Sequence, residues 1–415
     1  MLVYFADLAH TYSTENESLM VPLNIGYLKS YALKQHKNDV DIKLFKDPNK
    51  LLKAFYKKPP DLLGLSNYGW NEDLNYRIGQ FIKKEFPKTT IISGGPNMDD
   101  TTEFRIDFLK KNNHISYYIV DGGEEPFSEL ITWLKNNKET DIPKNIIYLK
   151  KNGELFSSGR RALKKEANHI ISPYLKGYLD EFLDLNMVPL IETNRGCPYR
   201  CTFCAWGMAS HNIVSRLNID NTLEEIKYIG KHSKANKWMI CDANFGILKR
   251  DVEIAEAIKK CKEDFGFPQS VFFYNDKRFT DISRSVIEIL GEINHIGLAL
   301  ALQTENPETL KAINRRNVTN EEIDRAISWA SKLGILTTTE LIFGMPYETR
   351  DSFVSQLDTA INRGFDSVLA HNLFLMDGIE LNRPDVRKKY GLKTKFRSLG
   401  VCYGKHDGNF FAEHE

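Results

Sequence analysis

The sequence lacks cysteine over a long stretch. None occurs among the first 196 of its 415 residues, and the six that follow are unevenly spread. Three fall close together at Cys197, Cys201 and Cys204, whereas the others lie apart at Cys241, Cys261 and Cys402. A disulfide-stabilised domain is usually smaller and has its cysteines at a higher density. This distribution excludes a disulfide framework and singles out one loop.

An excess of charge and long apolar runs are also absent. Fifty-six Lys and Arg nearly balance fifty-five Asp and Glu, which leaves a formal net charge of +1. Proteins that grip nucleic acid usually carry a clear basic excess, so we expect no nucleic-acid ligand. The N-terminus has no basic region and its apolar run is broken at Asp7, which predicts no secretory signal. No run approaches the ~20 apolar residues of a transmembrane helix, and we therefore expect a cytoplasmic protein.

Strand-like and helix-like runs alternate over the first part of the chain. The strand-like runs cover residues 2–8, 40–45, 61–70, 89–96 and 116–123. Alternation at this pitch predicts a doubly wound (Rossmann-like) α/β domain with a parallel sheet over residues 1–150. Asn152-Gly153 then predicts the turn of a β-hairpin. With a charged stretch that contains Pro173, the hairpin forms the connector that we expect over residues 151–186.

A second strand and helix series begins at Val188. Six strand–helix units predict a partial (β/α)6 barrel over residues 187–380, with the cysteine loop directly after its first strand. Loops at the carboxyl ends of such strands are where barrel enzymes place their catalytic residues. The remaining segment, 381–415, ends in residues 396–415 without a recognisable helix or strand, and we expect the chain to be truncated there.

The cysteine loop reads NRGCPYRCTFCAWG. Three thiolates cannot complete the four-cysteine shell of a structural zinc or an ordinary iron–sulfur cluster, so one position on the metal would stay open for chemistry. The alternatives are a zinc site completed by a distant histidine and three cysteines without a ligand. Cysteines without a ligand are normally buried singly, not gathered in a loop with Gly and Pro.

The spacing of Cys197, Cys201 and Cys204, with Phe203 before the third, resembles the signature of the radical S-adenosylmethionine (radical SAM) superfamily. The preceding strand and the following strand–helix series agree with it. The resemblance implies that these cysteines are the metal ligands of a [4Fe-4S] iron–sulfur cluster and that S-adenosyl-L-methionine (SAM) completes the fourth iron. An external one-electron reductant of flavodoxin or ferredoxin type would allow cleavage to methionine and a 5′-deoxyadenosyl radical, with the protein positioning the cofactor.

Other family landmarks imply further SAM contacts. CDANFG places Asp242 and Asn244 where members contact the methionine amino group. LQTENPETLKAINR resembles the ribose-binding segment, with Gln303 in place of the usual Glu and Thr304 in place of Ser. TTELIFGMPYET, with Glu340 and Gly344, resembles the segment beside the adenine. Each could instead be an ordinary strand end followed by a helix cap. Phe203 completes the implied SAM set.

The first domain resembles the cobalamin-binding domain that precedes some radical SAM cores. In that family a Ser on the third strand and a Gly pair on the fourth leave room for the cofactor's nucleotide tail, and Ser66 and Gly94-Gly95 occupy these places. The resemblance also implies contacts by Tyr68 and Gly122. The alternative is an ordinary nucleotide-type α/β domain. DLAHTYS departs from the Asp-x-His-x-x-Gly motif of histidine-ligated cobalamin, so His10 is predicted to be a loop residue and not a cobalt ligand.

The whole pattern resembles the cobalamin-dependent radical SAM methyltransferases. It implies methyl transfer to an unactivated carbon of a small-molecule or lipid-like substrate. A radical cyclase, ring-rearranging or oxidising enzyme would use the same cofactors. A tRNA methylthiotransferase would need a second three-cysteine cluster in its N-terminal domain, where this chain has no cysteine. A non-catalytic cobalamin carrier would not need the cysteine loop.

Overall fold

One seven-stranded sheet organises the first part of the protein. The computed structural model describes residues 1–10, 19–136, 139, 141–207, 212–294, 296–406 and 409–414. The sheet has the order β2-β1-β3-β4-β5-β6-β7, in which the first five strands are parallel and the last two are antiparallel. Its strands are β1 (Leu2–Ala6), β2 (Asp41–Phe45), β3 (Leu62–Ser66), β4 (Thr90–Gly94), β5 (Tyr117–Ile119), β6 (Ile146–Leu149) and β7 (Leu155–Ser157). The parallel α/β sheet expected from the sequence is therefore present.

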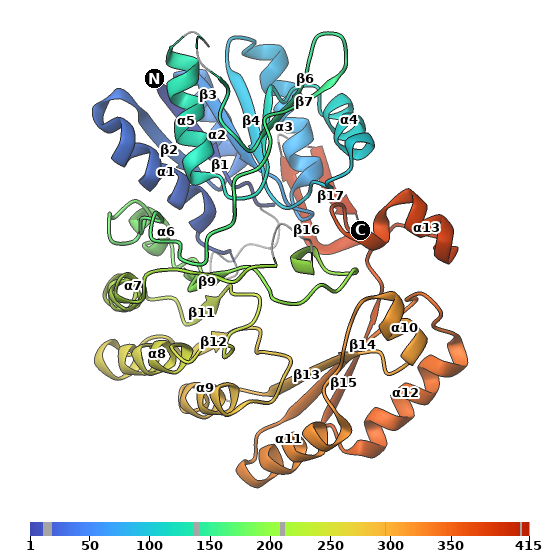
Figure 1. The fold of residues 1–415 in the computed structure, drawn as a ribbon. Coiled ribbons are helices and arrows are strands. Elements are labelled where there is room, and N and C mark those ends of the chain that lie inside the picture. The colour runs from blue at the N-terminus through green and yellow to red at the C-terminus, as the bar shows by residue number, and fades with distance from the viewer. Residues whose placement is uncertain are drawn as a thin grey trace.

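Helices cover both faces of this sheet (Figure 1). They are α1 (Leu23–His36), α2 (Pro48–Lys57), α3 (Glu72–Glu85), α4 (Thr102–Lys111) and α5 (Glu124–Lys135). Successive side chains of a strand point to opposite faces. Accordingly Phe5 of β1 packs in one core with residues of α1 and α5, and Tyr4 packs in another with residues of α2 and α3. Burial on both faces explains why β1 and β3 are continuous apolar runs.

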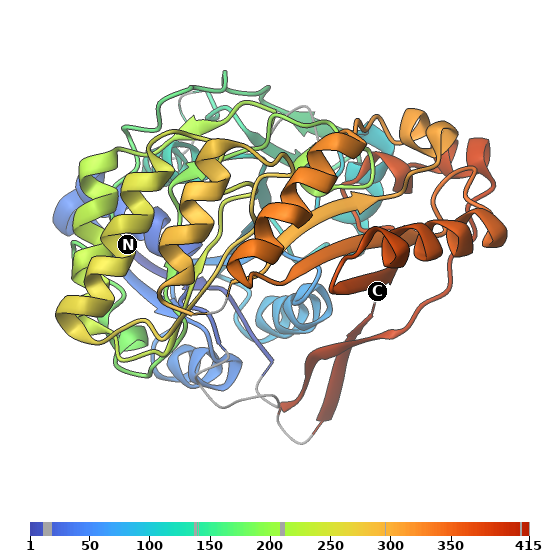
Figure 2. The same ribbon diagram turned by 90° about the horizontal axis from the view of Figure 1, so that it is seen from below.

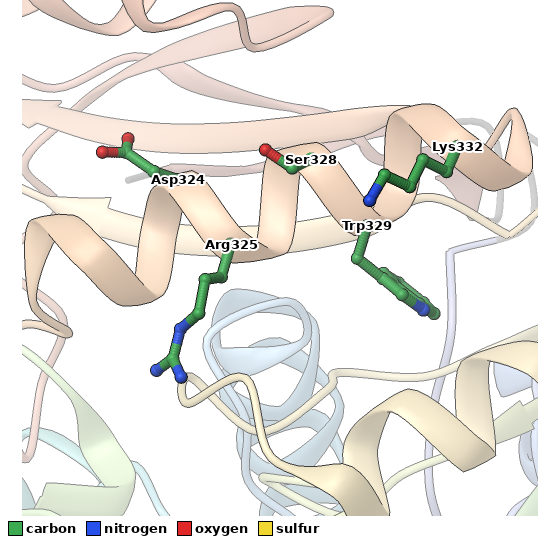
Figure 3. Close-up of a pocket in the computed structure, with 5 residues that line it drawn as sticks. All are labelled: Asp324, Arg325, Ser328, Trp329 and Lys332. Atoms are coloured by element: carbon green, nitrogen blue, oxygen red, sulfur yellow. The ribbon is translucent and has the colours of Figure 1, made fainter.

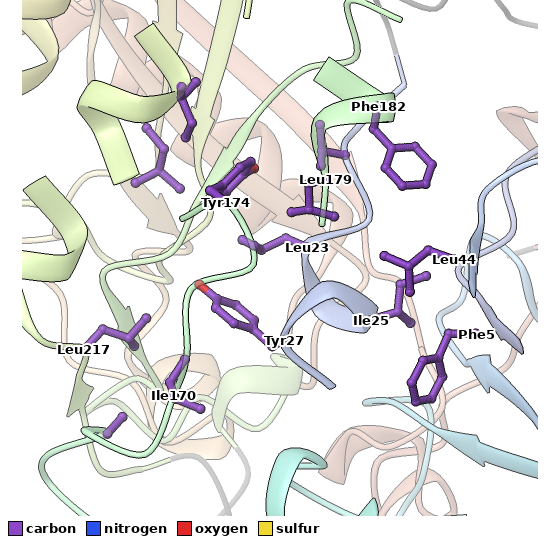
Figure 4. Packing of buried hydrophobic residues seen from close by; sticks show 14 of the residues in the cluster. Phe5, Leu23, Ile25, Tyr27, Leu44, Ile170, Tyr174, Leu179, Phe182 and Leu217 are labelled. Atoms are coloured by element: carbon purple, nitrogen blue, oxygen red, sulfur yellow. The ribbon is translucent and has the colours of Figure 1, made fainter. Parts of the chain in front are cut away.

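The segment between the two halves belongs to the protein core. The predicted hairpin forms as β6 and β7, and it extends the first sheet. The following residues contain the short helix α6 (Asp180–Leu183). Ile170, Tyr174 and Phe182 are buried among Leu23 of α1 and Leu217 of the second half (Figure 4). One continuous apolar core therefore joins the two halves.

The second half has six parallel strands in two separate three-stranded sheets. Their orders are β12-β11-β8 and β13-β14-β15. The strands are β8 (Leu190–Ile191), β11 (Lys237–Ile240), β12 (Ser270–Phe272), β13 (Leu298–Gln303), β14 (Thr337–Phe343) and β15 (Ser367–Asn372). The Asn275 side chain bridges the gap by donating from Nδ2 to the carbonyl oxygen of Ala299 at 2.8 Å. The six strands were predicted as one series, but the backbone ladder is interrupted between β12 and β13.

Helices line one side of these strands (Figure 2). They are α7 (Ile219–His232), α8 (Asp251–Phe265), α9 (Asp281–Gly291), α10 (Pro307–Ala312), α11 (Asn320–Leu333) and α12 (Arg350–Arg363). A small antiparallel ribbon pairs β9 (Asn194–Arg195) with β10 (Ser215–Arg216). No helix among the described residues is both long and apolar enough to cross a membrane.

The end of the chain is more ordered than the sequence predicted. The structure has α13 (Pro384–Tyr390) and an antiparallel hairpin of β16 (Ser398–His406) and β17 (Asn409–His414). The expectation that residues 396–415 lack a helix or strand is therefore wrong. The sequence between the two strands is Asp407-Gly408, a strong hairpin turn signal that the prediction overlooked. The hairpin runs back to the first half, where β17 lies against α3 (Figure 1).

Candidate active site around the cysteine loop

The cysteine loop is fixed to two distant segments by backbone hydrogen bonds. It follows β9, and the amide of Thr202 donates to the carbonyl oxygen of Ile313 at 3.1 Å. The amide of Leu381 donates to the carbonyl oxygen of Thr202, also at 3.1 Å. Cys197 and Cys201 are buried, at 8% and 6% exposed, and Cys204 is half-buried. The loop is thus a fixed part of the fold.

Hydrogen-bond donors face two of the three sulfurs. Asn244 Nδ2 lies 3.1 Å from Cys197 Sγ, and Arg315 Nη1 lies 3.7 Å from Cys201 Sγ. Burial raises the pKa of the Cys197 and Cys204 thiols, although backbone amides partly offset the effect. Donors aimed at sulfur are one of the ways in which proteins adjust iron–sulfur clusters. The donor set therefore fits a cluster bound through thiolates.

Among the described residues, no three His, Cys, Asp or Glu side chains are placed to hold one metal ion. A cluster has a different requirement, because each thiolate binds its own iron atom. Phe203, between the second and third cysteines, packs against a buried apolar cluster that includes Ile313 and Leu381 and so anchors the loop. Its contact with SAM stays a prediction.

Asp242 has a structural partner set that the sequence did not predict. Its buried carboxylate accepts hydrogen bonds from the amides of Thr193 (2.8 Å) and Asn194 (3.2 Å), and from both of their side chains. Burial raises its pKa to about 7. These four donors precede the cysteine loop directly, so Asp242 holds the approach to that loop in place. Its contact with a methionine amino group stays a prediction, and Asn244 is the member of this pair that reaches a cysteine.

Gln303 and Glu340 come together at neighbouring strands. Gln303 Nε2 donates to Glu340 Oε2 at 3.3 Å, and Gln303 has a left-handed backbone with φ of 67° at the end of β13. Its buried Oε1 has no hydrogen-bond partner within the described residues. Thr304 is fully buried and donates to Glu348 Oε2 at 2.8 Å instead. Gly344, with φ of 91°, directly follows β14 in the conformation that favours glycine.

The predicted cobalamin residues gather at one edge of the first sheet. Ser66 ends β3 and donates to Asp7 Oδ1 at 2.5 Å, while Gly94 ends the adjacent β4. Tyr68 stacks on the half-exposed Trp70 with ring centroids 4.3 Å apart. Beyond β5, an added Cβ at Gly122 would have no neighbour nearer than 3.7 Å. Ligands of open α/β sheets bind outside the carboxyl ends of the strands. This edge has three such strand ends and an open glycine, and it therefore suits a flat group laid against it.

Neighbouring backbone atoms of the protein explain the glycine pair at the end of β4. A Cβ at Gly95 would lie 2.1 Å from the Asn67 carbonyl oxygen, and Gly95 has φ of 142°. At Gly94 the Cβ would lie 3.1 Å from the carbonyl oxygen of Ile119. The sequence interpretation attributed both glycines to the space that a ligand needs. The structure requires glycine at 95 before any ligand is considered.

His10 is paired with a carboxylate from the far end of the chain. Its Nε2 lies 2.8 Å from Glu413 Oε1, and both side chains are buried. Glu413 also accepts from the amides of Asp73 (2.8 Å) and Leu74 (3.0 Å) in the first turn of α3. A carboxylate stabilises this end of a helix by satisfying free amides and favouring the helix dipole. That His10 is not a cobalt ligand stays a prediction. The imidazole ring is already paired with the Glu413 carboxylate.

Sequence reasoning missed two arginines beside the loop. Arg315, which contacts Cys201, also donates to the carbonyl oxygen of Ala301. Its signal was present, because it ends the segment compared with the family's ribose site. Arg195 precedes the first cysteine by two residues and binds Glu124 of α5 at 2.8 Å. Nothing in local spacing could have indicated that partner.

A surface hollow lies apart from all the residues assigned to cofactors. Its lining comes from one face of α11 (Figure 3): Asp324, Arg325, Ser328, Trp329 and Lys332. Trp329 packs on Phe279 with ring centroids 5.0 Å apart. The hollow shares no residue with the cysteine loop or with the edge of the first sheet.

Comparisons with known proteins agree with this geometry. Residues 191–360 match the sequence model of the radical SAM superfamily. The chain is 29% identical over 407 residues to the cobalamin-dependent radical SAM methyltransferase TokK of Streptomyces tokunonensis, covering 94% of this chain and 58% of TokK. It is 28% identical over 415 residues to 2-(S-pantetheinyl)-carbapenam-3-carboxylate methyltransferase of Streptantibioticus cattleyicolor, covering 96% and 59%. The chain thus spans less than three fifths of the length of these relatives.

A solved structure has a similar fold. Radical SAM methyltransferase TsrM from Kitasatospora setae, solved with cobalamin and a [4Fe-4S] cluster, superposes with a TM-score of 0.70 at 15% identity, covering 96% of this chain and 77% of TsrM. The matched segment 191–360 contains the cysteine loop, Asn244, Gln303 and Glu340. Residues 191–360 thus match the radical SAM superfamily, and the chain is similar over nearly its whole length to TokK, a cobalamin-dependent radical SAM methyltransferase.

Proposed function

We propose that this protein is a cobalamin-dependent radical SAM enzyme that transfers a methyl group to an unactivated carbon of a small molecule. The observation that carries the proposal is the fixed cysteine loop, with donors from Asn244 and Arg315 at its sulfurs. The similarity to TokK along nearly the whole chain supports methyl transfer over the radical cyclase, ring-rearranging and oxidising alternatives. The proposed substrate class includes lipid-like molecules. The proposed electron donor is an external reductant of flavodoxin or ferredoxin type.

The proposed roles follow the two halves. Residues 1–150 would form a Rossmann-like cobalamin domain and residues 187–380 a partial barrel that holds the cluster and SAM. Cys197, Cys201 and Cys204 would bind three irons, and the polar ends of Gln303 and Glu340 would hold hydroxyl groups of SAM by hydrogen bonds. Ser66, Tyr68, Gly94, Gly95 and Gly122 would line the cobalamin. When bound, the cluster with SAM supplies a carbon-centred radical and cobalamin supplies the methyl group.

The chain's own residues would position these groups and exclude water. The backbone bonds at Thr202 keep the cysteine loop rigid, and Asp242 orders the residues that lead into it. Rigid placement matters because reacting atoms held in near-attack geometry gain a large part of the rate enhancement. Burial of Cys197 and Cys201 keeps solvent from the sulfur ligands.

Cluster binding and turnover test this proposal. Anaerobically reconstituted protein should hold about four irons. Cys201→Ala should abolish iron binding, whereas Cys261→Ala, at a buried cysteine of α8, should retain it. Full iron content in the Cys201→Ala protein would contradict the proposal.

The second measurement follows the fate of SAM. With methyl-labelled SAM, cobalamin, a chemical reductant and a pantetheinyl carbapenam as the first probe, the protein should release S-adenosylhomocysteine and 5′-deoxyadenosine in comparable amounts. The label should appear on a carbon without a leaving group. Sustained 5′-deoxyadenosine release without S-adenosylhomocysteine would instead favour the cyclase or oxidase alternatives.

A further inference from the structure

Arg195 joins the cysteine loop to the first half of the protein. Its Nη1 lies 2.8 Å from Glu124 Oε1, and its Nε lies 2.9 Å from Glu192 Oε1. The guanidinium also lies 5.1 Å from the centroid of the Tyr27 ring. Glu124 and Tyr27 belong to α5 and α1, which pack on the first sheet, whereas Arg195 belongs to β9, just before Cys197. One planar group therefore contacts both halves.

The Glu124 side of this contact lies next to the edge of the first sheet. Glu124 is the first residue of α5 and follows Gly122-Gly123 at the end of β5. Its side chain is only 6% exposed, and Arg195 is the cation that pairs with it. The Arg195 side chain is 27% exposed, but the Glu124 carboxylate is buried, and loss of Arg195 would leave that carboxylate as an uncompensated buried charge. This pair therefore holds the start of α5 and the start of the cysteine loop together.

A second connection reaches the loop from its other side. Leu381 binds the Thr202 carbonyl oxygen, and two residues later Arg383 Nε binds Asp99 Oδ2 at 3.0 Å. Asp99 is buried in the connector that follows the glycine pair of β4. The connector after β4 is thus linked to the loop at Thr202, between its second and third cysteines, and the start of α5 is linked at Arg195, before the first cysteine.

We propose that Arg195 is a positioning residue that fixes the cysteine loop relative to the carboxyl edge of the first sheet, so that methyl transfer keeps pace with radical formation. This inference rests on the proposed function, since it assumes a cluster at the loop and cobalamin at the sheet edge. Lysine cannot replace Arg195, because a point charge lacks the planar fork that reaches Glu124 and Glu192 together. Loss of alignment by about 1 Å is enough to cost a reaction about 100-fold in rate.

The test compares Arg195→Lys and Glu124→Gln with a matched pair on the same helix. Glu129 of α5 binds Arg161, which lies in the connector away from the cysteine loop, so Glu129→Gln is the control. The first readout is the distance between the unpaired spins of the reduced cluster and of cob(II)alamin, measured by pulsed EPR in anaerobic holoenzyme. We expect one narrow distance in wild type and in Glu129→Gln, and a shifted or broadened one in the two test variants. Unchanged distances would overturn the inference.

The second readout is the ratio of S-adenosylhomocysteine to 5′-deoxyadenosine formed with the pantetheinyl carbapenam probe. It should fall by about tenfold or more in Arg195→Lys and Glu124→Gln at full iron content, and stay unchanged in Glu129→Gln. A wild-type ratio in both test variants would overturn the inference. Wild-type protein that makes no S-adenosylhomocysteine would contradict the proposed function instead. If both test variants fail to bind iron, Asp99→Asn, on the other flank of the loop, takes their place in both measurements with the same expected shift.

Discussion

The two halves of the chain use their parallel strands differently. In the first half, one seven-stranded sheet is covered on both faces, and β1 and β3 are buried along their whole length. In the second half, two three-stranded sheets meet at a gap bridged by Asn275, and β15 is largely exposed at the edge. Buried strands are held mainly by the removal of apolar surface from water. The gap in the second half is instead bridged by a polar contact, from the Asn275 side chain to the Ala299 carbonyl oxygen.

Truncation of a core side chain should give the largest difference in stability between the two halves. Phe127 of α5 is 1% exposed and packs on Phe5 with ring centroids 4.6 Å apart. Phe127→Ala should lower the free energy of unfolding by about 3–5 kcal/mol, because it leaves a cavity in the core. Leu369→Ala on β15, where the side chain is 43% exposed, should cost less than about 1 kcal/mol. Urea unfolding followed by circular dichroism measures both, and equal losses would contradict the contrast between the sheets.

The glycines at the edge of the first sheet provide a second test. Gly95→Ala should cost about 3 kcal/mol, because its Cβ would lie 2.1 Å from the Asn67 carbonyl oxygen. Gly122→Ala should stay within about 0.5 kcal/mol of wild type, since its nearest neighbour would be 3.7 Å away. Thermal unfolding without cofactor is the measurement. If Gly95→Ala retains wild-type stability and loses only cobalamin binding, a ligand and not Asn67 explains the glycine.

A buried acid in the second half should make stability fall as pH rises. Burial raises the pKa of Glu225 on α7 from 4.5 to about 8, and Glu192 adds to the effect. The folded protein then holds a proton that the unfolded chain releases, so stability falls from about pH 4.5 to about pH 8. The expected loss is about 1–3 kcal/mol. Glu225→Gln should reduce this slope, most clearly between about pH 7 and 8, whereas Glu224→Gln, at an exposed neighbour, should leave it unchanged.

A buried histidine in the first half should have the opposite effect, making stability fall as pH falls. Burial lowers the pKa of His114 from 6.5 to about 4, and the charge of Lys83 adds to the effect. Its neutral form is favoured in the folded state, so the stability it contributes is present above about pH 6.5 and is lost as pH falls towards 4. The expected change is about 1–2 kcal/mol. It should vanish in His114→Gln and persist in His232→Gln, where the histidine is exposed; a slope that survives His114→Gln would assign it elsewhere.

Local periodicity predicted most elements of both halves. The run 61–70 contains β3, the run 116–123 contains β5, and the cysteine loop follows the first strand pair of the second half. These elements depend on side-chain spacing within a single segment, which the sequence displays directly. The break between β12 and β13 was not predictable, because it depends on a pairing between strands and on the side chain of Asn275.

Contacts at the candidate site were harder to predict because their partners are far apart in sequence. Arg315 and Cys201 are separated by 114 residues, and Arg383 and Asp99 by 284. Spacing within a motif carries no signal for such pairs. Asp242 was assigned to a ligand because of its motif, yet its donors, Asn194 and Thr193, lie 48 and 49 residues earlier in the chain. The motif predicted a ligand contact for Asp242 but not the side chains that hold this carboxylate in place.

The contact between His10 and Glu413 has a consequence for synthesis of the chain. The two residues are 403 positions apart, and Glu413 also accepts from the first amides of α3. On the ribosome the first sheet can assemble early, since domains generally fold from the N-terminus as they emerge. The start of α3 must nevertheless wait for residue 413 before its amides gain this partner. Until then, the Glu413 partner of His10 and of these amides is missing, and water contacts them instead. These groups become buried when β17 packs against the start of α3.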